Sequence, residues 1–187
     1  MCHYITATLP HGVDLTLAAP IFESHKLGFQ LISNPHVAQQ IDSRERYILT
    51  TRKYCDCGTA LGSLSRRRSV KVRGYDLELK RFRKQGWTEA KIKRWVEQKE
   101  QTRERHLRED GAIAGSTTPE LESELSFLND LFDSTNTQKF GILLHWYHAN
   151  IESERIEIQR TEKLRLSEVN AERLMRIKDD VLYEIVP

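Results

Sequence analysis

The sequence Phe140-Gly141-Ile142-Leu143-Leu144-His145-Trp146-Tyr147 is apolar at almost every position and decides the fold class. A run this short and this apolar is typical of a β-strand that is buried on both faces.

Five further segments have the β-branched or alternating composition of strands. One of them, 156–166, predicts either one long strand or a hairpin that turns near Thr161-Glu162. The others are 4–9, which stops at Pro10, 29–32, 46–51 and 181–186.

Helices are predicted between these strands. Asp14 is placed to cap a first helix, in which Pro20 indicates a kink or a late start. Thr118-Pro119-Glu120 is a good helix start, and Ser167 begins the last helix. A helical pair is predicted over 75–85 and 88–109. Because strands and helices do not alternate regularly, we predict an α+β fold with a mainly antiparallel sheet and an inserted helical hairpin.

The composition is that of a globular protein. The chain has 187 residues, of which 39% are hydrophobic and 30% are charged. We therefore predict a single α+β domain over residues 1–187, with a basic helical excursion at about 65–134. We expect no membrane segment and no secretory signal, and three cysteines do not form a disulfide framework. These features predict a cytoplasmic protein.

The three cysteines suggest a candidate metal site. Cys2 precedes the first predicted strand, and Cys55 and Cys57 follow the third. If these strands pair antiparallel, about 4.8 Å apart, the three sulfur atoms and His3 meet at one edge of the sheet. Three thiolates and one imidazole are a known structural zinc set, so zinc is the cofactor that the grouping suggests.

The spacing leaves other interpretations of the cysteines open. Only Asp56 separates Cys55 from Cys57, whereas zinc ligands usually have two to four residues between them. His145 or His148 would be an alternative fourth ligand, although a hydrogen-bonded core histidine is the expected role of His145. Free cysteine is also among the most buried residue types, which favours three inert packing residues.

A third interpretation is a reactive thiol. Arg52 and Lys53 would lower the pKa of neighbouring cysteines, and Cys2 would carry a free α-amino group if Met1 is removed. The opening Met1-Cys2 resembles the start of amidotransferases that use an amino-terminal cysteine. His3 follows here, however, where that family has a glycine-rich sequence. We therefore assign no catalytic residue.

Charge is unevenly distributed, although the formal net charge is only +2. The segment 65–110 has 16 Lys and Arg against 8 Asp and Glu, and the rest of the chain has 13 against 19. Such a segment is typical either of a long solvated helix or of a surface that binds an acidic partner.

Basic and aromatic residues are interleaved in this segment, as in surfaces that bind phosphates and stack on bases. Acidic residues interrupt the positive charge, which favours a protein partner with Trp87 and Trp95 as anchors. We predict a small non-catalytic binding protein that occupies a protein partner, as inhibitors and immunity proteins do. Nucleic-acid binding is the second prediction, and a zinc- or thiol-centred enzyme is the third. The predicted binding residues are Arg66, Arg67, Arg68, Arg73, Arg83, Trp87, Lys91, Arg94 and Trp95.

Overall fold

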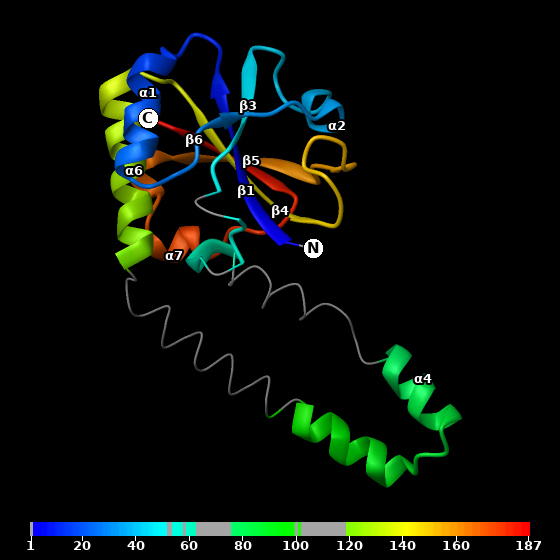
Figure 1. Ribbon diagram of the computed structural model, residues 1–187. Coiled ribbons are helices and arrows are strands. Elements are labelled where there is room, and N and C mark those ends of the chain that lie inside the picture. The colour runs from blue at the N-terminus through cyan, green and yellow to red at the C-terminus, as the bar shows by residue number, and fades with distance from the viewer. Residues whose placement is uncertain (1, 52–53, 58, 63–75, 100, 102–118) are drawn as a thin grey trace. The chain divides into compact units, whose positions relative to one another are not determined.

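The computed structural model describes residues 2–51, 54–57, 59–62, 76–99, 101 and 119–187. Its six strands form one sheet in the order β2-β3-β1-β4-β6-β5 (Figure 1). The strands are β1 (Cys2–Pro10), β2 (Gln30–Leu31), β3 (Glu45–Leu49), β4 (Phe140–Tyr147), β5 (Arg160–Arg165) and β6 (Val181–Val186). The helices are α1 (Leu15–Ser24), α2 (Pro35–Ala38), α4 (Asp76–Lys84), α6 (Pro119–Thr135) and α7 (Ala171–Leu174), with a 3-10 turn at Leu166–Glu168.

The sheet confirms the predicted α+β class. β1 pairs antiparallel with both β3 and β4, β4 pairs antiparallel with β6, and β2 pairs antiparallel with β3. β5 is the exception, because it pairs parallel with β6. β4 begins and ends where the apolar run predicts, and its residues from Phe140 to Leu144 are buried.

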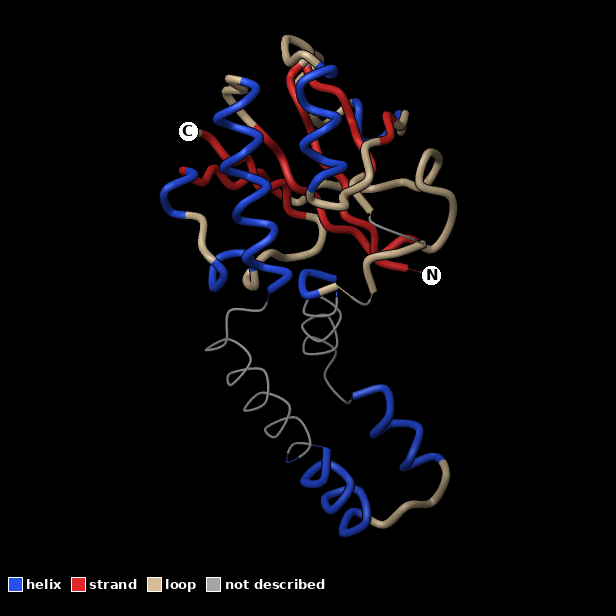
Figure 2. The backbone as a smooth tube through the Cα atoms, turned by 60° about the vertical axis from the view of Figure 1, so that its left-hand side comes forward, coloured by secondary structure: helices blue, strands red, loops and turns tan. Residues whose placement is uncertain are grey.

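The two faces of the sheet carry different hydrophobic clusters. On one face, Ala7 and Leu9 of β1 pack with Phe22 of α1 and with Phe127 and Leu128 of α6. α1 and α6 lie side by side over this face (Figure 2). The other face carries the cluster Val37, Tyr47, Leu143, Tyr147, Ile156 and Leu182. Side chains alternate along a strand, so neighbouring residues of β1 serve different clusters.

Two helices, α1 and α6, begin at the residues that the sequence predicts. The Asp14 side chain accepts the backbone N–H of Thr16, as expected of a helix cap, and α1 begins at Leu15 and continues through Pro20. α6 begins at Pro119, which suits the first helical position because proline has no N–H to leave unpaired.

The predictions for the last third of the chain are partly wrong. The segment 156–166 is neither one long strand nor a hairpin at Thr161-Glu162, since β5 pairs with β6 continuously from Arg160 to Arg165. A chain reversal at 161–162 would break that register. The helix expected from Ser167 is replaced by the 3-10 turn and by α7, whose cap is Asn170.

The chain divides into two compact units, Met1–Arg66 with Thr118–Pro187, and Arg67–Thr117. The helical excursion is therefore shorter than the predicted 65–134. α6 belongs to the sheet unit because it buries one apolar face there, including Leu121, Leu131 and Phe132. In the described part of the chain, none of the helices has the length and apolar character needed to span a bilayer.

Candidate metal centre

The loop that carries Cys55 and Cys57 completes the sheet beside the start of β1. β3 pairs with β1 only from Thr6 to Pro10, so residues 2–5 of β1 have no β3 partner on that side. The loop takes this place. The Asp56 N–H donates to the carbonyl of His3 at 2.8 Å, and the Ile5 N–H donates to the Asp56 carboxylate at 2.7 Å. This pairing brings the loop against Cys2.

Asp56 anchors the loop from inside. Its side chain is only 1% exposed, and its carboxylate also accepts the Thr51 hydroxyl at 2.7 Å. Its carbonyl accepts the N–H and the hydroxyl of Thr59. Gly62 packs directly on it, since a Cβ at Gly62 would lie 1.9 Å from the Asp56 carbonyl oxygen. Asp56, which lies between the two cysteines, is therefore held by contacts of both its side chain and its backbone.

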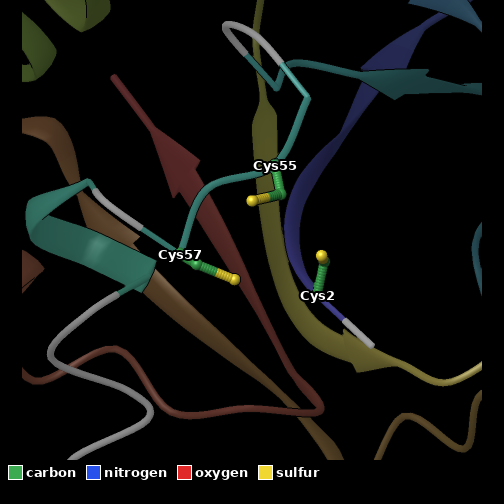
Figure 3. A group of neighbouring side chains, drawn as sticks. All are labelled: Cys2, Cys55 and Cys57. Carbon is green, nitrogen blue, oxygen red and sulfur yellow. The ribbon is translucent and has the colours of Figure 1, made fainter.

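The sulfur atoms of Cys2, Cys55 and Cys57 all lie within 4.8 Å of one another. They face a common space, as the close-up in Figure 3 shows. All three are free thiols and partly exposed. Tetrahedral zinc with bonds of about 2.3 Å separates its sulfur ligands by roughly 3.8 Å, so only a small contraction would close the site. The predicted meeting of the three sulfurs is confirmed.

Backbone amides point at two of the sulfurs. The His3 N–H donates to the Cys57 sulfur at 3.2 Å. The hydrogen bond from the Cys57 N–H is the main reason why the pKa of Cys55 lies below its usual range. Burial and the neighbouring thiols instead raise the pKa of Cys2. Amide donors stabilise thiolate, which is the form of cysteine that binds metal.

His3 does not join the three sulfurs, so its placement in the predicted ligand set is wrong. It is paired with Trp146 across β1 and β4, and their rings meet edge to face at 4.5 Å. The buried ring has its Nε2 3.4 Å from the Asp179 carboxylate. The reason is strand alternation, since His3 and Cys2 are consecutive and point to opposite faces of the sheet.

The alternative fourth ligands are not in the group either. His145 lies between two carboxylates, with Nδ1 bonded to Asp180 and Nε2 3.5 Å from Glu154. His148 is exposed, and its backbone N–H donates to Glu154. Within the described residues, the three cysteines are the only close group of His, Cys, Asp or Glu that could hold a metal ion.

The acidic partners of His145 were not predicted from the sequence. Asp180 is 35 residues away and adopts a left-handed backbone conformation with φ of 60°. Glu154 is held by the N–H groups of His148 and Ala149. Burial of the His145 ring opposes its charged form, but the bonds and charges of Asp180 and Glu154 outweigh burial and raise its pKa. His145 is thus a hydrogen-bonded ion-pair residue.

Replacing His145 by glutamine is expected to destabilise the protein more at about pH 5.5 than at about pH 8.5. The raised pKa means that the charged ring stabilises the fold fully below the unfolded pKa and loses this effect as the pH rises through the folded pKa. The difference should be on the order of 1 kcal/mol, measured by denaturant unfolding at both pH values. His11→Gln, at an exposed position, is the control. An equal loss at both pH values would contradict this assignment.

Part of the predicted binding arm lies outside the described residues, namely Arg66, Arg67, Arg68 and Arg73. The predicted anchors Trp87 and Trp95 pack on Phe82, with ring centroids at 4.3 and 4.8 Å. They therefore form the small core between α4 and the helical residues 89–99, and both are partly exposed.

The described basic residues of the arm lie on its surface. Arg83 pairs with Glu89 at 2.8 Å, Lys91 lies 4.0 Å from the Trp87 ring centroid, and Arg94 is exposed. Binding of a protein partner or of nucleic acid by this arm stays a prediction.

Comparison of the chain with known protein families, with curated protein sequences and with solved structures finds no match. The geometry of the three sulfurs and of the loop that holds them is therefore the basis for inferring a function.

Proposed function

We propose that the protein binds a thiophilic metal ion, zinc in the first place, through Cys2, Cys55 and Cys57. The observation that carries this proposal is the convergence of three sulfur atoms within 4.8 Å from segments more than fifty residues apart in the chain. Inert packing cysteines have no reason to gather at one partly exposed point. Thiolate is the ligand that zinc and other soft ions prefer.

The surroundings of the sulfurs also favour a metal ligand over a nucleophile. A catalytic cysteine needs a base that removes its proton and is itself oriented by a third group. Among the described contacts, the donors to Cys55 and Cys57 are backbone amides and neighbouring thiols. Amide donors of this kind tune and orient sulfur ligands, and they take up no proton.

Zinc titration of the reduced full-length protein tests the proposal. We expect one equivalent of zinc to bind, as measured by competition with a zinc-chelating dye, and to protect all three cysteines from a thiol reagent. Each single Cys→Ser variant should weaken binding at least about 100-fold, because one of three thiolates is lost. Tyr54→Phe, at a neighbouring side chain that is 94% exposed, should bind like the wild type.

Circular dichroism and cooperative unfolding of each variant separate loss of the site from loss of the fold. A folded wild-type protein that retains no zinc, and whose three thiols react freely with and without zinc, would overturn the proposal.

A further inference from the structure

The three sulfurs leave one position of a tetrahedral ion without a protein ligand among the described residues. Asp56 stands between two of the cysteines, but its carboxylate is buried and accepts hydrogen bonds from Ile5 and Thr51. His3 is next to the third cysteine, but its buried ring lies against Trp146. Neither side chain belongs to the group of three sulfurs.

In the part of the chain that the structure describes, solvent can reach the three cysteines. All three cysteines are partly exposed, although the Asp56 side chain between them is almost fully buried. Zinc sites with three protein ligands and an accessible fourth position bind water or an external molecule there, whereas closed four-ligand sites are structural. The geometry at this loop therefore resembles the open kind of site.

We infer that the metal centre takes an external thiol as its fourth ligand, an inference that rests on the proposed zinc binding. A metal ion in a three-thiolate set is matched best by a fourth soft donor, and sulfur is softer than carboxylate or carbonyl oxygen. A thiol that coordinates zinc loses its proton. In the exchange, the zinc–water bond breaks and a zinc–sulfur bond forms, the water leaves, and the thiol proton passes to solvent.

Cobalt(II) substitution tests the inference, because cobalt reports its ligands through visible and near-ultraviolet absorption. The probe is 2-mercaptoethanol, added to the cobalt-loaded full-length protein under anaerobic conditions. We expect the sulfur-to-cobalt absorption to rise by about one third, since four thiolates replace three. Ethylene glycol, which has a hydroxyl in place of the thiol, should change nothing.

The outcomes separate the two proposals. A protein that develops no sulfur-to-cobalt absorption at all would refute the metal site itself. A cobalt-loaded protein whose spectrum is unchanged by the thiol, or whose absorption falls because the thiol removes the metal, would refute the open position and leave the metal site standing.

Discussion

Replacing Asp56 by alanine is expected to lower the free energy of unfolding by about 2–4 kcal/mol and to weaken zinc binding at least tenfold. The Asp56 side chain is buried and accepts the Ile5 N–H and the Thr51 hydroxyl. Alanine would leave both donors unpaired away from water, and unpaired buried donors are costly. The loop would then lose the side-chain contacts that help to hold Cys55 and Cys57 beside Cys2, and the backbone bond from Asp56 to His3 would remain on that side.

Denaturant unfolding and zinc competition on the same preparations measure both effects. Asp56→Asn, which retains an oxygen acceptor of the same size, should lose less than Asp56→Ala. Asp133→Ala, at an exposed position in α6, should change neither quantity. If Asp56→Ala unfolds within 0.5 kcal/mol of the wild type, the carboxylate does not anchor the loop.

Replacing Gly62 by alanine is expected to destabilise the protein by about 1–3 kcal/mol and to reduce zinc affinity at least tenfold. The new Cβ would lie 1.9 Å from the carbonyl oxygen of Asp56 and 2.7 Å from its carbonyl carbon. These are backbone atoms, so they cannot turn away as a flexible side chain would. Relief of the clash must displace Asp56 and, with it, the two cysteines on either side.

Gly62 lies in a helical turn, where alanine normally stabilises a protein relative to glycine. A loss of stability in Gly62→Ala would therefore point to the clash with Asp56. Gly12→Ala is the matched control, since a Cβ at Gly12 would meet no atom within 4 Å. It should leave stability and zinc affinity unchanged. A Gly62→Ala protein as stable as the wild type and with full zinc affinity would show that the loop can shift without harm to the site.

The fold could be predicted where the residues of a single segment are enough to define a helix or a strand. The apolar run gives β4 its bounds, and the chemistry of Asp14 and Pro119 gives the starts of α1 and α6. The parallel pairing of β5 with β6 could not be predicted, because it depends on contacts between segments and not on the pattern of either. The packing of α6 on the sheet unit could not be predicted either, because the apolar face of a helix does not show which surface it covers.

The site was predictable to a similar extent. The antiparallel pairing of β1 with β3 is enough to bring Cys2 near the Cys55–Cys57 loop. The error about His3 was avoidable, since consecutive residues of a strand point to opposite faces. The anchoring role of Asp56 was not visible in the sequence, because its partner Ile5 is 51 residues away.

The central proposal is that three cysteine sulfurs bind one zinc ion. X-ray absorption at the zinc edge, recorded on the zinc-loaded protein in buffer without added thiol, tests this claim directly. We expect three sulfur neighbours at about 2.3 Å and one lighter neighbour at about 2.0–2.1 Å. A first shell of oxygen and nitrogen alone, or a protein that retains no zinc to measure, would contradict it.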